Sequence, residues 1–252
     1  ITTVLDLATR VKAHPETYAT TMQRKELLMI FEKPSLRTRV SFEAGMSQMG
    51  GHAIYYDTST SPFGAGKETI HDMIKVAGRF VDLIMARLFE HAHMEEMAEH
   101  SDVPVINALT NFAHPCQILA DFLTIREKKG RLEGLKLAYL GDACNNVTHS
   151  LMYGCARTGM QLAIGCPDDE AFRPLPDVLR QAEATASLSG AGITVTADAM
   201  EAARDADMVY ADSWMSYHIP REELDKRVSI PSPYQVNADV MAPAGPDAIF
   251  MN

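Results

Sequence analysis

The chain has 252 residues, of which 46% are hydrophobic and 22% charged, and this composition is typical of a globular protein with one large domain or two ordinary ones. The formal net charge of −10 opposes non-specific binding to nucleic-acid phosphate, so we expect no nucleic-acid partner. The longest apolar runs are much shorter than the roughly 20 residues of a bilayer-spanning helix, so we expect no membrane span.

The first half of the chain alternates short apolar segments with longer amphipathic ones. Strands are expected at residues 27–32, 52–56, 83–87 and 105–109. Residues 38–49 and 69–79 have helical periodicity, and a further helical segment covers residues 115–128. This alternation predicts a parallel sheet with crossover helices, which is the α/β class.

The second half repeats the pattern after a polar, glycine-bearing segment at residues 128–134, which has the composition of a domain joint. Strands are expected at residues 135–140, 161–165, 193–196, 208–211 and 248–251. We therefore predict two similar α/β domains, residues 1–127 and residues 128–252. The last segment ends where a strand should lead into a loop, so we expect the C-terminal part of the second domain to be missing.

A Ser-x-Arg-Thr segment opens the helix that follows the first expected strand. Ser35, Arg37 and Thr38 lie where the free N–H groups and the positive dipole end of a helix favour a bound dianion. The segment therefore predicts a phosphate site. The alternative is an ordinary capped helix with surface arginines, because Ser and Thr are common N-caps.

A His-Pro-Cys-Gln segment, His114 to Gln117, follows the fourth expected strand and precedes a helix. The His ring and the Gln amide could hold the carbonyl oxygen and the amino group of a small planar substrate and stabilise an oxyanion as it forms. Arg87 ends the third expected strand, at the sheet edge where α/β proteins place functional loops. The alternatives are a His that caps its own helix and an ordinary surface Arg.

These three elements, in this order, resemble the carbamoyltransferase family, and the resemblance covers nearly the whole chain. The segment Phe31-Glu-Lys-Pro-Ser35 is more similar to the ornithine branch than to the aspartate branch, where the residue before Pro is usually acidic. The resemblance implies that residues 35–38 bind phosphate, that Arg87 and His114 bind the carbamoyl oxygen, and that Gln117 binds the carbamoyl nitrogen. The implied carbamoyl phosphate site contains Ser35, Leu36, Arg37, Thr38, Arg87, His114 and Gln117. Leu36 stands where the family more often has Thr, and Arg37, Arg87 and His114 are the implied catalytic residues.

The segment after the first strand of the second half, Gly141-Asp-Ala-Cys-Asn-Asn146, is similar to the family's G-D-x-x-N-N segment. The similarity implies that Asn146 binds the ornithine carboxylate. The same stretch could be a degenerate dinucleotide loop, although it lacks the G-x-G-x-x-G spacing that lets a pyrophosphate approach. A nucleotide-dependent oxidoreductase therefore stays as a competing interpretation.

The segment Asp212-Ser-Trp-Met-Ser216-Tyr217 is similar to the D-x-W-x-S-M-G loop of the ornithine branch. The similarity implies that Asp212 pairs with the ornithine α-ammonium and that Ser216 adds a hydrogen bond. No segment matches the R-x-Q-x-E-R pattern that the aspartate branch needs for its second carboxylate. Tyr217 and His218 replace the usual Met-Gly and give the expected acceptor loop a bulkier tip. The alternative role for Asp212 is a helix or turn cap.

Two further features follow from the resemblance. Residues 59–69 are similar to a loop that reaches the active site of a neighbouring subunit in a homotrimer, and Lys67 is the residue expected to reach it. The alternative is a flexible surface loop, which Gly64 and Gly66 would equally suit. The family's H-C-L-P loop should begin at about Asn252, where the chain ends.

The activity implied by the resemblance is the transfer of a carbamoyl group from carbamoyl phosphate to the side-chain amine of ornithine. Citrulline and phosphate are the products, the reaction belongs to arginine metabolism, and no cofactor or metal is expected. The competing hypotheses are a transferase for another amine, such as putrescine or N-acetylornithine, and a non-catalytic paralogue. The N-terminus has no secretory pattern and the four cysteines have no metal-type spacing, so a reducing, cytoplasmic location is expected.

Overall fold

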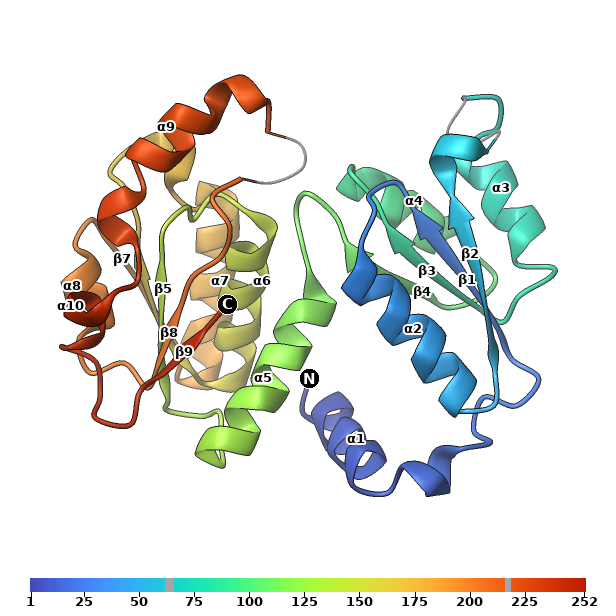
Figure 1. The fold of residues 1–252 in the computed structure, drawn as a ribbon, viewed down its shortest axis with the longest axis horizontal. Coiled ribbons are helices and arrows are strands. Elements are labelled where there is room, and N and C mark those ends of the chain that lie inside the picture. The colour runs from blue at the N-terminus through green and yellow to red at the C-terminus, as the bar shows by residue number, and fades with distance from the viewer. Residues whose placement is uncertain (62–65, 216–218) are drawn as a thin grey trace. The chain divides into compact units, whose positions relative to one another are not determined.

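The computed structural model describes residues 1–61, 66–215 and 219–252. The chain divides into two compact units: the first unit is Thr3–Cys116, and the second unit is Gln117–Asn252 together with Ile1–Thr2. Each unit contains one parallel sheet flanked by helices, which confirms the predicted fold class (Figure 1). The domain boundary expected after residue 127 stays a prediction. The division between the two units falls within helix α5 (Pro115–Lys129), which begins in the first unit and continues in the second.

The first unit is built on a four-stranded sheet with the strand order β2-β1-β3-β4. Its strands are β1 (Glu26–Phe31), β2 (His52–Asp57), β3 (Leu83–Arg87) and β4 (Val105–Leu109). Its helices are α1 (Thr2–Ala13), α2 (Leu36–Gln48), α3 (Ile70–Ala77) and α4 (His91–His100), with short 3₁₀ turns η1 (Pro15–Tyr18) and η2 (Thr58–Thr60). All pairings are parallel, so the carboxyl ends of the four strands lie at one edge.

Both faces of this sheet are covered, as the apolar character of its strands requires. Successive side chains of a strand point to opposite faces, so Met29 and Phe31 pack in a cluster with Met46 of α2. Ile30 points the other way and packs in a second cluster with Ile74 of α3 and residues of α4. These two clusters hold the β1–α2 connection between two packed layers.

The second unit is built on a five-stranded sheet with the order β7-β6-β5-β8-β9. Its strands are β5 (Lys136–Leu140), β6 (Gln161–Gly165), β7 (Gly192–Thr196), β8 (Met208–Tyr210) and β9 (Ile249–Met251). Its helices after α5 are α6 (Asn146–Thr158), α7 (Pro176–Ser189), α8 (Ala199–Ala203), α9 (Leu224–Ser229) and α10 (Ala238–Met241). Its 3₁₀ turns are η3 (Glu170–Phe172), η4 (Arg221–Glu223) and η5 (Ser232–Tyr234).

Helices cover both faces of the second sheet as well. α6 and α7 pack on one face, and α5 lies against α6 so closely that a side chain at Gly154 would meet Phe122 at 2.7 Å (Figure 1). α8 and α10 cover the opposite face, where Ala202 and Val240 pack with Leu140. The sheet is parallel throughout, so the loops after β5 and β8 leave from the same edge.

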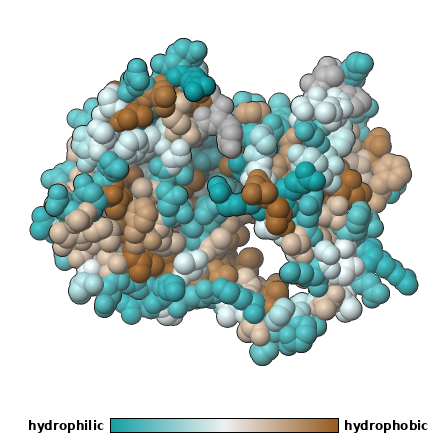
Figure 2. All heavy atoms as spheres, in the orientation of Figure 1, coloured by the Kyte–Doolittle hydropathy of each residue, from teal (hydrophilic) through white to brown (hydrophobic). Residues whose placement is uncertain are grey.

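The surface of the part drawn in colour carries mixed hydrophilic and apolar side chains (Figure 2). Among residues 1–61, 66–215 and 219–252, no helix combines the length and the hydrophobicity needed to cross a bilayer. The most exposed large apolar side chains are those of Leu188, Leu36 and Phe80.

Candidate active site

The predicted phosphate segment forms the start of α2. Ser35 is the N-cap residue: its Oγ accepts a hydrogen bond from Thr38 N (3.3 Å) and donates one to Thr38 Oγ1 (3.0 Å). Leu36 is 79% exposed and Arg37 is exposed, and among the described residues Arg37 forms no ion pair. The start of a 13-residue helix with a hydroxyl cap and an uncommitted guanidinium can bind an anion.

Arg87 lies at the carboxyl end of β3, opposite Phe31 of β1, and is almost fully buried. Its carbonyl accepts a hydrogen bond from Glu32 N (2.9 Å), which ties it to the β1–α2 connection. His114 directly precedes α5 and is close enough to Arg87 to feel its charge. Burial, and then the Arg87 charge, lower the pKa of His114 from 6.5 to about 4. The imidazole is therefore neutral at physiological pH and can donate an N–H next to a cation.

Two residues that the sequence analysis did not single out fix these loops. Lys33 is 3% exposed, donates a hydrogen bond to Asn111 Oδ1, and lies 4.5 Å from the centroid of the Phe89 ring. Glu32 Oε2 accepts a hydrogen bond from Phe89 N (2.6 Å). The residues just before Ser35 thus anchor the loops that follow β3 and β4. Burial, and then Arg87, lower the pKa of Lys33 to about 8.

Gln117 lies in the first turn of α5 and belongs to a network in the second unit. Its Nε2 donates to Asp121 Oδ1 (3.0 Å), and Tyr210 OH donates to Asp121 Oδ2 (3.0 Å). Burial raises the pKa of Asp121 to about 6, although both hydrogen bonds oppose the change. Because Nε2 is committed to Asp121, the amide oxygen of Gln117 is the atom left to accept a hydrogen bond from a ligand amino group.

The predicted acceptor residues lie beyond the ends of β5 and β8. Asn145 is the N-cap of α6 and accepts a hydrogen bond from Thr148 N (2.8 Å). Asn146 is therefore the first residue of the helix, where a ligand carboxylate would meet the positive end of the helix dipole. Asp212 follows β8 and is mostly buried, and burial raises its pKa. Among the described residues no Lys, Arg or His forms an ion pair with Asp212.

The structure does not connect three other predicted residues, Ser216, Tyr217 and Lys67, with either group of site residues. Ser216 and Tyr217 lie outside the described residues. Lys67 is exposed in the turn that leads into α3. Among the described residues, no hydrogen bond or ion pair joins Lys67 to the start of α2.

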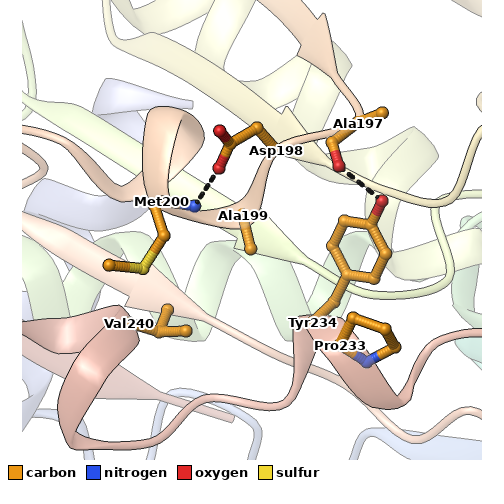
Figure 3. Close-up of a pocket in the computed structure, with 7 residues that line it drawn as sticks. All are labelled: Ala197, Asp198, Ala199, Met200, Pro233, Tyr234 and Val240. Carbon is orange, nitrogen blue, oxygen red and sulfur yellow. Dashed lines mark hydrogen bonds between the residues drawn. The ribbon is translucent and has the colours of Figure 1, made fainter.

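A separate open pocket of about 380 Å³ lies beside α8 in the second unit (Figure 3). Its lining consists of Ala197, Asp198, Ala199, Met200, Pro233, Tyr234 and Val240. Asp198 already accepts from Met200 N (2.8 Å), and Tyr234 OH donates to Ala197 O (2.7 Å). The pocket has no basic group for a phosphate, so it is not a candidate for the anion site.

No group of His, Cys, Asp and Glu side chains in the described ranges could hold a metal ion. The arrangement found is instead one of hydrogen-bond donors and charges. The carboxyl edge of the first sheet carries a capped helix start, Arg87 and the neutral His114. The carboxyl edge of the second sheet carries buried carboxylates and the start of α6. The first edge suits an anion, and the second suits a cationic group.

Comparison with known proteins identifies the family. Residues 1–127 match the aspartate/ornithine carbamoyltransferase carbamoyl-P binding domain, and residues 133–252 match the family's Asp/Orn binding domain. The chain is 48% identical to the ornithine carbamoyltransferase of Bacillus subtilis (strain 168) over 228 residues, 90% of this chain and 70% of the relative. It is 42% identical to the ornithine carbamoyltransferase of Listeria monocytogenes serotype 4a over 252 residues, 100% of this chain and 78% of the relative.

Solved structures give the same answer. The structure of ornithine carbamoyltransferase from Pyrococcus furiosus superposes with a TM-score of 0.92 at 42% identity, covering 99% of this chain and 79% of that one. That of ornithine transcarbamoylase from Giardia lamblia gives 0.89 at 39% identity, covering 100% and 80%. The resemblance stated from the sequence is thus confirmed over both units, and the chain belongs to the aspartate/ornithine carbamoyltransferase family.

Proposed function

We propose that this protein transfers the carbamoyl group of carbamoyl phosphate to the side-chain amine of L-ornithine, giving citrulline and phosphate. The observation that carries the proposal is the carboxyl edge of the first sheet, where β1 and β3 pair with Phe31 opposite Arg87. The chain that leaves β1 beside Arg87, where Glu32 N donates to the Arg87 carbonyl (2.9 Å), continues into the capped start of α2. The names of the relatives, all ornithine carbamoyltransferases at 42–48% identity, support ornithine as the acceptor.

Carbamoyl phosphate is the ligand of the first edge in this proposal. The phosphate dianion would bind the N–H groups at the start of α2, the hydroxyls of Ser35 and Thr38, and the guanidinium of Arg37. Leu36 would contribute its backbone N–H. The carbamoyl oxygen would accept hydrogen bonds from Arg87 and from the neutral ring of His114. The amide oxygen of Gln117 would accept from the carbamoyl NH₂.

Ornithine is the ligand of the second edge. Asp212 is a mostly buried carboxylate with no cationic partner among the described residues, and such a group calls for a cation. The α-ammonium of the acceptor would supply it. Asn146, at the start of α6, would bind the α-carboxylate with help from the helix dipole. Ser216 and Tyr217 stay proposals as neighbours of the acceptor.

The reaction then needs positioning and charge stabilisation. A primary amine has a reference pKa of about 10.4, so the neutral amine must be selected before it attacks the carbonyl carbon. The new C–N bond converts the carbonyl oxygen to an oxyanion, which Arg87 and His114 would stabilise. The C–O bond to phosphate breaks next, the leaving phosphate takes the electron pair, and the amine gives up its proton.

The test is formation of the carbamoylated product by the full-length protein, which is citrulline for ornithine, with putrescine, N-acetylornithine and aspartate compared as the other acceptors. A strong preference for ornithine is the expected result. Activity only with another amine would support the proposed carbamoyl phosphate site and would refute ornithine as the acceptor. No product with any acceptor would refute the proposed function and favour a non-catalytic relative.

We also propose a homotrimer in the cytoplasm, with Lys67 contributed to the site of a neighbouring subunit. Leu36 and Val40 lie one turn apart on α2, and Ile54 lies on the edge strand β2; all three are large apolar side chains that remain exposed. Exposed apolar side chains such as these favour self-association when an interface buries them. Light scattering should give three times the chain mass, whereas a monomer would refute the trimer.

A further inference from the structure

An ion pair joins the loop after β5 to helix α9, and neither of its residues has a role in the reaction described above. Arg227 Nη1 donates to Asp142 Oδ2 over 2.6 Å, and the two side chains are 15% and 4% exposed. The guanidinium also lies 4.8 Å from the centroid of the buried Phe172 ring. Its Nε is 3.5 Å from Glu223 Oε2 on the preceding turn. Arg227 is therefore held on three sides, as its planar fork allows.

Helix α9 has no buried apolar face that could fix its position. It has six residues, and none of them is buried. Its apolar residues Leu224 and Val228 are both exposed, so hydrophobic packing does not fix the helix. A short helix without a buried face has little stability of its own. Arg227, the least exposed link between α9 and the sheet, therefore sets the position of the helix.

The loop after β5 also contacts the segment that follows Asp212. Gly141 has a φ of +123°, and a side chain there would lie 2.8 Å from Trp214 Nε1. The indole of Trp214 thus lies directly against the Gly141 backbone, two residues after Asp212. Two neighbouring residues of the β5 loop, Gly141 and Asp142, contact the chain at Trp214 and at Arg227.

The pair also orders the charges at this edge. Burial raises the pKa of Asp142, Arg227 opposes that rise, and the nearby Asp212 adds to it. Without Arg227, the buried Asp142 carboxylate would have no cation beside it and would tend to take up a proton. With Arg227 in place, Asp142 is neutralised internally, and Asp212 is the carboxylate left to pair with a ligand.

We propose that the Asp142–Arg227 pair is a positioning element for the acceptor: it fixes α9 and the loop after β5 so that Asp212 meets the α-ammonium in a set geometry. The proposal rests on the ornithine function proposed above. The competing explanation is that the pair only stabilises the fold. Buried ion pairs contribute little net stability compared with apolar residues, whereas removal of one partner leaves an uncompensated charge. Single and double variants therefore separate the two explanations.

The experiment compares Arg227→Met, Asp142→Asn and the double variant with the wild-type full-length protein. Arg180→Met is the matched control, because Arg180 forms an exposed ion pair with Asp177 on α7. Each protein is assayed for KM of ornithine, KM of carbamoyl phosphate and kcat. Binding of L-norvaline, which has the α-amino acid end of ornithine without the side-chain amine, reports on Asp212 without catalysis. Trp214, the one tryptophan of the chain, provides a fluorescence signal beside the pair.

The expected result is a specific loss at the acceptor end. Arg227→Met and Asp142→Asn should raise KM for ornithine and Kd for L-norvaline at least tenfold, with KM for carbamoyl phosphate within about twofold of wild type. Acrylamide should quench Trp214 more strongly in both. The double variant should regain thermal stability, because no buried charge is left unpaired, and should keep the high KM for ornithine. Arg180→Met should change none of these values.

Two outcomes would overturn the proposal. One is a folded Arg227→Met protein with the wild-type KM for ornithine. The other is a double variant in which stability and KM for ornithine both return to wild type, since a fold-stabilising role predicts that coupling. Absence of citrulline in the wild-type enzyme would refute the proposed function by itself. Trp214 quenching in the unliganded variants would still decide whether the pair anchors this loop.

Discussion

The unusual state of His114 leads to a prediction about acid stability. Its pKa is lowered from 6.5 to about 4, first by burial and then by Arg87. In the unfolded chain the ring takes up a proton as the pH falls through 6.5, whereas in the folded chain it does so only near pH 4. The neutral ring therefore contributes stability above pH 6.5 that is lost progressively as the pH falls to about 4.

The size of the effect follows from the two pKa values. The full difference corresponds to about 3 kcal/mol, and about 2 kcal/mol of it is lost between pH 7.5 and pH 5.0. His114→Gln removes the titrating ring and keeps a side chain that can form hydrogen bonds. The free energy of unfolding of this variant should fall between those two pH values by about 2 kcal/mol less than that of the wild type.

The assay is urea unfolding at both pH values, with hydrogen exchange used to identify the transition of residues 3–116. His14→Gln is the matched control, because the His14 side chain is 70% exposed and has water around it in both states. An equal pH dependence in His114→Gln and wild type would refute the reasoning. So would an NMR titration of the His114 ring with a midpoint near 6.5, because the ring would then carry charge in the working range.

Three other variants test further parts of the structure. Arg37→Ala should reduce turnover about 10²-fold to 10³-fold, since one charge-stabilising donor is lost, while the circular dichroism spectrum stays unchanged because Arg37 is exposed; near-normal carbamoyl transfer would contradict its role. Burial raises the Asp121 pKa to about 6, so the wild type should lose at most about 3 kcal/mol of stability as the pH rises from 3.8 through 6. Asp121→Asn should remove this loss, and an unchanged pH profile of unfolding would contradict the prediction. Gly154→Ala should destabilise by about 1–3 kcal/mol through contact with Phe122, whereas Gly45→Ala in α2, with nothing within 4 Å, should stabilise by about 0.5–1 kcal/mol; thermal melts that rank the two the other way would contradict the packing described.

The inner strands of the two sheets, such as β3, β5 and β6, could be predicted from the sequence because they are buried on both faces. A parallel strand that is covered on both sides consists of a short apolar run, and such runs end at polar loops. The expected strand at residues 83–87 is β3 (Leu83–Arg87), and the expected strand at residues 161–165 is β6 (Gln161–Gly165). The helix Thr2–Ala13 was not predicted, although Val4, Leu7, Ala8 and Val11 have helical spacing; only Leu5 on it is buried.

The motif residues could be predicted because each motif is local. Ser35 caps the helix whose first turn contains Thr38, so a four-residue pattern contains both partners. Their binding roles stay predictions until substrates are tested. The supporting residues could not be found in the same way, because their partners are far along the chain. Lys33 bonds to a residue 78 positions away, and Asp121 to one 89 positions away.

The signs of the buried charges connect the two units of an acidic protein to its two substrates. The first unit buries Lys33 and Arg87, and the second unit buries Asp121 and Asp142 and leaves Asp212 half-buried. Buried ions are costly unless they meet the opposite charge, so each edge selects a ligand of the opposite sign. Asp142 alone among these three carboxylates has an internal arginine in the described part of the chain. An acceptor without an α-ammonium would leave Asp212 uncompensated. The discrimination against N-acetylornithine should therefore come from the second unit alone, whatever the affinity of the first unit for carbamoyl phosphate.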